Sequence, residues 1–189
     1  MQFVIPFCHK DAGLAEKLCA WIGELGGLDS RHRCLLLAAK ATPAGNRAAV
    51  LNEALKSMGC HVEMVETSTA NEKGWPESCN HLFYCAAELM RKRGVPFLWL
   101  EPDCTPLRKT WLDEIETEYV SARKPYLGCV FGKPWRHLTG CAVYPAVVRA
   151  YNAASLMPAR NPKGPIPWDV VNPEATLKHT HVTKLIFHE

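Results

Sequence analysis

The chain has 189 residues, of which 48% are hydrophobic and 22% are charged, and this length and balance suit one compact domain with a packed core. Such a composition excludes a disordered, collagen-like or coiled-coil chain. The formal net charge of +3 permits an anionic partner but is too small for a dedicated nucleic-acid binder. No apolar run approaches the roughly 18–20 residues that span a bilayer, and the start carries no basic leader or cleavage site. We therefore expect a cytoplasmic protein.

The first third of the chain alternates strands with helices. We expect strands at residues 2–7, 34–39 and 61–65, because each is a short apolar or alternating run. Helices are expected at 10–25 and 44–58, where apolar residues recur every three or four positions and glycines follow. This alternation predicts a largely parallel sheet, since parallel neighbours need a crossover connection. Ligands of such sheets bind at the carboxyl ends of the strands.

The rest of the chain continues the alternation of strands and helices and then becomes rich in proline. The further expected elements are helices at 77–93 and 106–122, strands at 96–100, 126–131 and 138–144, and a short helix at 146–154. Residues 157–167 contain four prolines and are expected to form an extended loop. The whole pattern predicts a single α/β domain, with a mostly parallel sheet covered by helices on both faces.

The nine cysteines are expected to be reduced thiols. No two of them have CxxC spacing, which excludes a zinc ribbon and a thioredoxin-type pair. Several, including Cys34, Cys129 and Cys141, lie in apolar runs, where a thiol behaves as a small buried hydrophobe. We therefore interpret them as core residues.

The most informative stretch is Phe97–Asp103, where an apolar strand ends in the acidic tripeptide Glu101-Pro102-Asp103. In extended backbone, residues two apart point the same way, so the carboxylates of Glu101 and Asp103 can converge. Paired carboxylates are ligands for Mg²⁺ or Mn²⁺ when substrate phosphates complete the shell. The alternative is that Asp103 merely caps the helix expected at 106–122.

This tripeptide resembles the DXD-like motif of nucleotide-sugar glycosyltransferases of GT-A fold, with Glu in place of the usual first Asp. Phe3–Lys10 is similar to that family's first strand and nucleotide-contacting loop, and Gly74–Asn80 to its donor-contacting loop. Leu138–Pro145 resembles its acceptor-side strand. The resemblance covers about residues 1–145. More narrowly, the combination of GWP, WLEPD, HLTG and VYP is similar to small glycosyltransferase-like proteins of bacteriophages.

The resemblance implies a GT-A-like, Rossmann-related fold, in which residues 1–145 bind a nucleotide sugar and residues 146–189 complete the metal shell and the acceptor side. It implies a glycosyltransferase that uses Mn²⁺ or Mg²⁺ and a nucleoside-diphosphate sugar, with uridine the expected base. A divalent ion there stabilises the negative charge of the diphosphate leaving group. The acceptor could be a saccharide, a protein or a hydroxylated base of phage DNA. The residues expected at the donor are Pro6, Phe7, His9, Lys10, Trp75, Asn80, Pro102 and Gly140.

Histidines are the candidates to complete the metal shell. Enzymes of the resembled family often supply a late histidine, and His188 is our first choice. A last strand is expected around His179, His181 and His188, and alternation along it places His179 and His181 on one face and His188 on the other. His137 could ligate the metal or hydrogen-bond a phosphate, and the alternative is a surface turn.

Asp169 and Trp168 are the acceptor-side candidates. The resemblance implies that Asp169 deprotonates the acceptor hydroxyl if the reaction inverts configuration. Trp168 could stack on a sugar or a base. The alternative is that Trp168 caps the core and Asp169 is exposed.

Two other functions are weighed against the transferase. A nucleotidyltransferase also combines an α/β sheet with paired acids, but it usually carries a glycine-rich phosphate loop after the first strand, and none follows Phe7. A non-catalytic member that binds a sugar or a partner is disfavoured by the intact Glu101 and Asp103. P-loop, dinucleotide, nucleophile-elbow and HExxH motifs are absent. The oligomeric state is left open.

Overall fold

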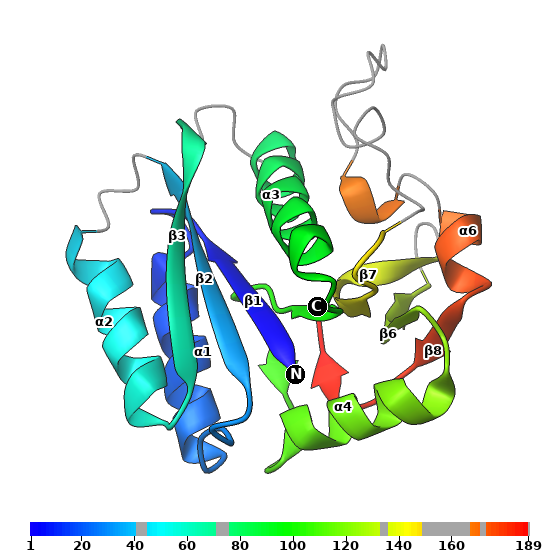
Figure 1. Cartoon of the computed structure of the whole chain (residues 1–189), viewed down its shortest axis with the longest axis horizontal. Helices are drawn as coiled ribbons and strands as arrows, with labels where there is room; N and C mark the ends of the chain where they lie inside the picture. Colours follow the sequence, from blue (N-terminus) through cyan, green and yellow to red (C-terminus); the bar gives the residue numbers. More distant parts are fainter. Residues whose placement is uncertain (41–44, 71–75, 133–135, 149–166, 171–172, 189) are drawn as a thin grey trace.

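A single seven-stranded sheet organises the chain. The computed structural model describes residues 1–40, 45–70, 76–132, 136–148, 167–170 and 173–188. The strand order is β3-β2-β1-β4-β7-β6-β8, and Figure 1 shows these strands side by side. The strands are β1 (Gln2–Phe7), β2 (Arg33–Lys40), β3 (His61–Ala70), β4 (Phe97–Trp99), β6 (Tyr126–Phe131), β7 (His137–Tyr144) and β8 (Thr180–Val182).

The sheet is parallel from β3 to β4 and mixed beyond it. β1 pairs in parallel with both β2 and β4, and β2 pairs in parallel with β3. β7 is antiparallel to β4 and to β6, whereas β8 is parallel to β6. The carboxyl ends of β1 and β4 therefore lie together at one edge, with β7 beside them.

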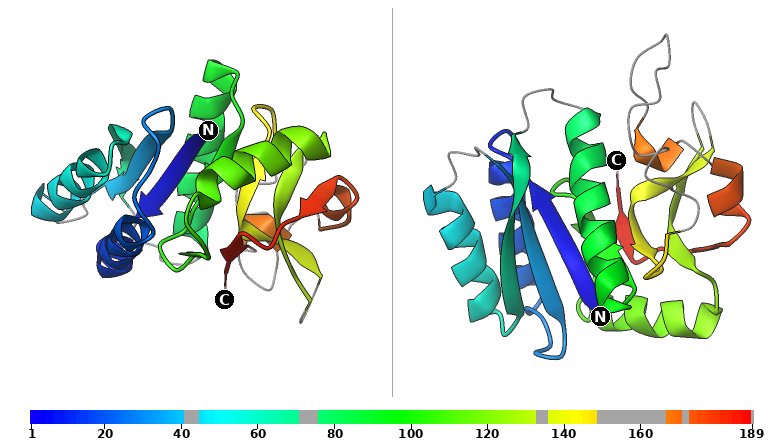
Figure 2. Two further views of the ribbon diagram at one scale, coloured as in Figure 1. Left: turned by 90° about the horizontal axis from the view of Figure 1, so that it is seen from below. Right: turned by 45° about the horizontal axis from the view of Figure 1, so that its top comes forward.

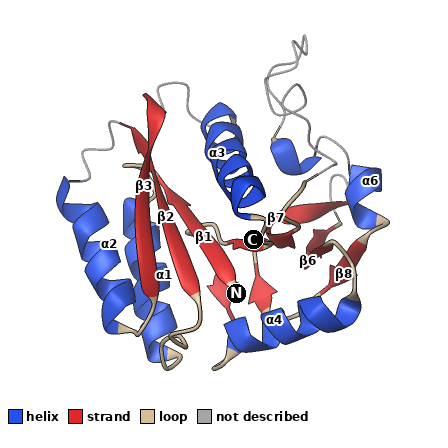
Figure 3. Ribbon diagram, in the orientation of Figure 1, coloured by secondary structure: helices blue, strands red, loops and turns tan. Residues whose placement is uncertain are grey.

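Helices cover both faces of the sheet, as Figure 3 shows in blue and red. Side chains of β1 alternate between two hydrophobic clusters, with Phe3 and Ile5 in one and Val4 in the other. The first cluster includes residues of α1, α2 and α4, and the second includes residues of α3 and η1. Seen from below in Figure 2, α1 and α3 lie on opposite sides of the strands. The helices are α1 (Ala12–Glu24), α2 (Gly45–Ser57), α3 (Glu77–Arg93), α4 (Trp111–Ala122), η1 (Trp168–Val170) and α6 (Pro173–Leu177).

The predicted α/β fold, with its mostly parallel sheet and two helical layers, is confirmed. The expected bounds of β1 (2–7), β6 (126–131) and α3 (77–93) are those of the structure. Helix α3 illustrates how such an element ends. It ends at Gly94, which has the left-handed φ of 68° that favours glycine. None of the described helices is long and apolar enough to cross a membrane.

Two expected helices differ from the structure. The helix expected at 106–122 begins only at Trp111, because Thr105–Pro106 forms strand β5. β5 pairs with β9 (Ile186–Phe187) in a second, antiparallel sheet of two strands. The first three residues of the helix expected at 146–154 are not helical. The rest of it, and all but Pro167 of the expected loop 157–167, lie outside the described residues.

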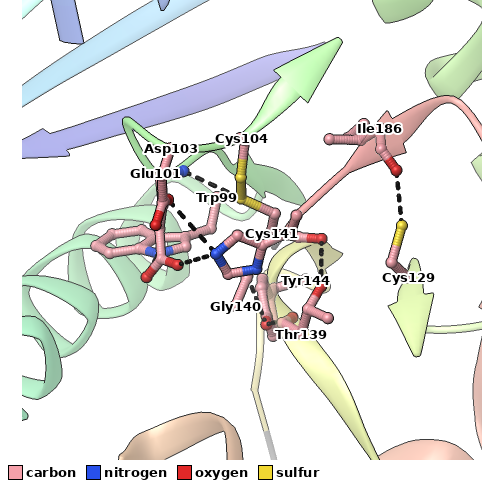
Figure 4. Close-up of a disulfide and its surroundings, with 11 residues drawn as sticks. Trp99, Glu101, Asp103, Cys104, Cys129, Thr139, Gly140, Cys141, Tyr144 and Ile186 are labelled. Atoms are coloured by element: carbon pink, nitrogen blue, oxygen red, sulfur yellow. Dashed lines mark hydrogen bonds and ion pairs between the residues drawn. A yellow bond between two sulfur atoms is a disulfide. The ribbon is translucent and has the colours of Figure 1, made fainter. Parts of the chain in front are cut away.

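The cysteine prediction is wrong for one pair. Cys104 and Cys141 form a disulfide across 37 residues of sequence, with their Cα atoms 6.8 Å apart, as Figure 4 shows. Cys104 directly follows the acidic tripeptide after β4 and Cys141 lies in β7, and the pairing of β4 with β7 brings the two segments together. Cys34 is a free, buried thiol and Cys129 a free, partly buried one. The prediction of core thiols therefore holds for Cys34 but not for Cys141.

Candidate functional site

The acidic tripeptide lies where β4 ends, beside the carboxyl end of β1. The backbone N–H of Leu100 donates to the carbonyl of Val4 at 2.9 Å, which extends the β1–β4 pairing up to the motif. Trp99 Nε1 donates to Glu101 Oε1 at 3.1 Å and fixes that carboxylate. The side chain of Glu101 is 20% exposed and that of Asp103 is 54% exposed. Figure 4 shows the two carboxylates close together next to the disulfide.

His188 joins the two carboxylates from the far end of the chain. Its Nε2 lies 3.2 Å from Glu101 Oε2 and 3.4 Å from Asp103 Oδ1. The β5–β9 pairing produces this contact, because Thr105 faces Phe187 directly across that small sheet. The structure thus brings together three of the four predicted metal ligands.

Gly140 leaves the room that Glu101 occupies. A Cβ atom at Gly140 would lie 2.7 Å from Glu101 Oε2 and 3.0 Å from its Cδ. Tyr144 donates its hydroxyl to the Gly140 carbonyl at 3.0 Å and so fixes the strand beneath the carboxylate. We expected Gly140 to contact the donor, whereas in the structure it backs the carboxylate that faces the site.

His188 is a cation held between two anions. Burial lowers its pKa, but the hydrogen bonds to Asp103 and Glu101 and the negative charges of both carboxylates together raise it, to about 10. The hydrogen bond to His188 in turn lowers the pKa of Asp103. At neutral pH the imidazolium therefore supplies the positive charge that balances the carboxylates.

The donor set of these three residues fits a divalent cation. One carboxylate oxygen each from Glu101 and Asp103 and one ring nitrogen of His188 lie within 4.8 Å of one another. Carboxylates suit Mg²⁺ and Mn²⁺, and a neutral imidazole is a common third ligand for a transition metal. The imidazolium must lose its proton to bind a metal, so binding of a cation by these three residues releases a proton from His188.

A cavity of about 340 Å³ opens beside the carboxylates. It groups the predicted donor residues Pro6, His9, Lys10 and Pro102 with Glu101 and Asp103. The start of α3 forms another part of its lining, through Ser78, Cys79 and Leu82. Strand-end residues from β1 and β4 and the first turn of a helix therefore surround one space, as expected for the ligand edge of a parallel sheet.

Asp11 is a site residue that the sequence analysis missed. It lines the same cavity, and its Oδ1 accepts a hydrogen bond from the Cys8 backbone at 2.5 Å. Burial raises the pKa of Asp11, and the charge of Asp103 adds to that rise. Asp11 follows His9 and Lys10 directly after the first strand, so the position that predicted those two residues also indicates Asp11.

Three expected site residues are core residues instead. Phe7 is 0% exposed. Trp168 is 2% exposed, and its ring stacks on Phe83 with centroids 3.6 Å apart. Asn80 accepts a hydrogen bond from the Trp168 backbone at 2.8 Å. The side chains of Phe7 and Asn80 are thus buried and do not line the cavity, and Trp168 packs in the core whereas Asp169 is mostly buried beside it. Trp75 lies outside the described residues.

Asp169 and His137 form a pair near the carboxylates. His137 Nε2 lies 3.7 Å from Asp169 Oδ2, and the side chains are 13% and 19% exposed. Burial and the charge of Glu101 raise the pKa of Asp169 to about 6, although His137 opposes the rise. His137 is thus paired with Asp169, and it does not belong to the described groups that could hold a metal. His181 lies elsewhere, 2.9 Å from Glu118.

Comparisons with known proteins give structural neighbours only. Neither a protein-family model nor a curated protein sequence matches the chain. The galactosyltransferase LgtC, solved with donor and acceptor sugar analogues, matches 97% of this chain and 73% of its own, with a TM-score of 0.59 and 13% identity. Mouse xyloside xylosyltransferase 1 matches 97% of this chain and 85% of its own, with a TM-score of 0.59 and 9% identity.

Two longer glycosyltransferases also share the fold. The mannosyltransferase PcManGT from Pyrobaculum calidifontis, solved with GDP-mannose and Mn²⁺, has a TM-score of 0.51 and 13% identity over 68% of this chain. S. aureus TarS, solved with UDP-GlcNAc, has a TM-score of 0.52 and 10% identity over 77% of this chain. The chain spans 34% and 45% of these two proteins. At identities this low, the structural matches establish only a shared fold, which is that of GT-A-type glycosyltransferases.

Proposed function

We propose that this protein is a glycosyltransferase that depends on a divalent cation and takes its sugar from a nucleoside diphosphate. The observation that carries the proposal is the convergence of Glu101, Asp103 and His188, of which the two carboxylate residues line a cavity. A carboxylate pair with an imidazole suits a cation whose remaining positions bind phosphate oxygens. The structural neighbours support the reaction class, because they share the fold and several were solved with nucleotide sugars.

Glu101, Asp103 and His188 would hold Mn²⁺ or Mg²⁺, which would supply Lewis-acid stabilisation of the leaving diphosphate. Trp99 and Gly140 keep Glu101 in place, one by a hydrogen bond and the other by leaving space. In the metal-free protein the His188 cation balances the carboxylates. The protein thus holds the site together before the cation arrives.

The cavity is the proposed donor site. Pro6 and Pro102 provide rigid apolar walls from the neighbouring carboxyl ends of β1 and β4, and Lys10 supplies a positive charge for the diphosphate. Asp11 is a carboxylate acceptor within the same lining and suits a ribose hydroxyl. We propose uridine as the base, following the resemblance in the sequence.

Asp169 is the proposed general base if the reaction inverts configuration. A base works best when its pKa lies near the operating pH, and burial together with Glu101 raises the pKa of Asp169 to about 6. His137 faces Asp169 and is suited to hold its carboxylate in one orientation. The proposed acceptor is a hydroxyl of a saccharide, a protein or a hydroxylated base in phage DNA.

Binding titrations with nucleoside diphosphates in Mn²⁺ test the proposal. Wild-type protein should bind at least one nucleoside diphosphate in Mn²⁺ and lose that binding when Mn²⁺ is chelated. The Asp103→Ala variant should lose the metal-dependent part of the affinity. Glu53→Gln is the control, because Glu53 lies in α2 with a side chain 72% exposed and outside the cavity lining. Equal metal-dependent affinity in the wild type and Asp103→Ala would exclude the assignment.

Product analysis separates the transferase from its alternatives. A transferase releases a nucleoside diphosphate from a nucleotide sugar, whereas a nucleotidyltransferase releases pyrophosphate from a nucleoside triphosphate. A non-catalytic member binds the nucleotide sugar and releases neither product. Release of pyrophosphate alone would replace the proposed function with nucleotidyl transfer.

A further inference from the structure

Two buried sulfur atoms lie directly beneath the proposed cation site. Cys104 follows Asp103 in the chain and is 3% exposed, whereas Cys141 follows Gly140 on β7 and is 0% exposed. Figure 4 shows their disulfide next to the Glu101 and Asp103 side chains. The sulfur pair therefore borders the same corner of the sheet as the carboxylates.

His188 belongs to two different groups of metal-ligating atoms. In one group a ring nitrogen of His188 lies within 4.8 Å of carboxylate oxygens of Glu101 and Asp103. In the other it lies within 4.8 Å of the Sγ atoms of Cys104 and Cys141. The first group suits a hard cation, and the second suits a soft one such as Zn²⁺. Because the two groups share one imidazole at the same corner of the sheet, a cation in one group competes with a cation in the other.

The backbone next to the sulfur atoms provides a hydrogen-bond donor of the kind found beside metal-bound thiolates. The N–H of Glu101 donates to Cys141 Sγ at 3.2 Å. Such a donor stabilises negative charge on sulfur and orients it, which is the role that outer hydrogen bonds play at metal sites. A Zn²⁺ ion would balance the thiolate charges in a place that also borders Glu101, whose carboxylate is 3.2 Å from His188 Nε2 and is a candidate fourth ligand.

We propose that reduction of the Cys104–Cys141 disulfide converts this corner into a zinc site made of Cys104, Cys141 and His188. The reductant is a low-molecular-weight thiol of the glutathione class. Two such thiols give two electrons to the disulfide, form their own disulfide and leave two cysteine thiols. Zn²⁺ then displaces both thiol protons and the imidazolium proton of His188, and it binds two thiolates and the neutral imidazole.

The oxidised and reduced proteins should therefore prefer different metals. Disulfide sulfurs are neutral and poor ligands, because the thiolate is the form of cysteine that binds metals. The oxidised protein thus offers only the carboxylates and His188. In the reduced protein Zn²⁺ occupies His188, and the cation site of the proposed transferase loses its nitrogen ligand. This last consequence rests on the proposed function, whereas the zinc site itself does not.

Cobalt spectroscopy tests the zinc site without any activity measurement. Co²⁺ added to protein reduced with a phosphine should give the charge-transfer absorption of cobalt–thiolate bonds, and a stoichiometric addition of Zn²⁺ should abolish it. Oxidised wild-type protein should give no such absorption and should bind Zn²⁺ at least about tenfold more weakly in a chelator competition. The comparison uses one polypeptide in two redox states, so it does not depend on a variant that folds.

Two variants identify the ligands. Reduced Cys141→Ser should lose the cobalt–thiolate absorption in part and weaken Zn²⁺ binding at least about tenfold. Cys129→Ser is the matched control, because Cys129 is a free, partly buried cysteine that donates to the Ile186 carbonyl, outside both groups. Equal zinc affinity in the two redox states, or an unchanged cobalt spectrum in Cys141→Ser, would overturn the proposal. Absence of Mn²⁺-dependent nucleotide binding in the oxidised protein, with the zinc results as expected, would instead count against the proposed function alone.

Discussion

Replacing Asp169 by Asn should make the metal-free protein more stable at neutral pH. Burial and the charge of Glu101 raise the pKa of Asp169 from 3.8 to about 6, so its ionised form is less stable in the folded protein than in the unfolded chain. At about 1.4 kcal/mol per pKa unit, this shift corresponds to about 3 kcal/mol. Asparagine has a similar shape and no charge, so the variant should regain up to this amount.

The gain should depend on pH in a defined direction. The folded pKa of Asp169 is the higher one, so stability at this residue is greatest below pH 3.8 and falls as pH rises to about 6. The difference between Asp169→Asn and wild type should therefore be largest above pH 7 and shrink toward pH 4. Urea unfolding at several pH values, with a chelator present, measures it.

Asp113→Asn is the control with the opposite sign. Burial raises the pKa of Asp113, but its hydrogen bond to His32 and the charges of His32 and Arg31 lower it overall. Its replacement should therefore destabilise the protein at neutral pH. If Asp169→Asn is no more stable than wild type at pH 7.5, or gains as much at pH 4, the explanation based on the charge of Asp169 is wrong.

Three further predictions concern the cation site and its support. Gly140→Ala should weaken metal binding about tenfold or more, because the added Cβ would lie 2.7 Å from Glu101 Oε2. Calorimetry with Mn²⁺ measures the affinity. Gly132→Ala is the control and should bind Mn²⁺ normally, because its added Cβ would have no atom within 4 Å. Metal binding should release about one proton from His188, whose pKa is about 10, so the metal affinity should rise nearly tenfold per pH unit below pH 9. Calorimetry in two buffers of different ionisation enthalpy counts the released proton. A metal affinity that does not depend on pH would contradict the displacement of this proton. Asn80→Ala should cost about 1–3 kcal/mol in urea unfolding, because it removes the acceptor of a 2.8 Å backbone hydrogen bond; an unchanged stability would show that this bond does not hold η1 in place.

The sequence predicted most of the fold because the main elements carry their own patterns. The strands β1 and β2 are continuous apolar runs, and α3 repeats apolar residues at helical spacing up to Gly94. The acidic motif was equally accessible, since an apolar strand followed by Glu101-Pro102-Asp103 is visible without any structure. These features depend on neighbours in sequence, which a single sequence displays directly.

The rest of the site depends on contacts between distant segments. His188 reaches Asp103 through β5 and β9, which have two residues each and are too short to show any periodicity. Strand alternation separates His188 from His179 and His181, but it does not show that His188 lies beside Asp103. The Cys104–Cys141 pair also depends on a long-range contact, the pairing of β4 with β7.

The aromatic residues show a different limit. A tryptophan beside an acid in a proline-rich stretch is compatible with a ligand platform or with the core. The stacking of Trp168 on Phe83 decides for the core, and this contact joins η1 to α3 across 85 positions of sequence. The role of Asn80 also depends on a distant segment, because its hydrogen-bond partner in η1 cannot be predicted from the sequence of α3 alone.

Anomalous diffraction from crystals grown with Mn²⁺ and a nucleoside diphosphate tests the central claim most directly. We expect one manganese peak at ligand distances of about 2.0–2.6 Å from carboxylate oxygens of Glu101 and Asp103 and from a ring nitrogen of His188. The diphosphate should extend from the metal into the cavity lined by Pro6, His9 and Lys10. A manganese peak elsewhere on the protein, or a nucleotide bound without contact to the metal, would contradict it.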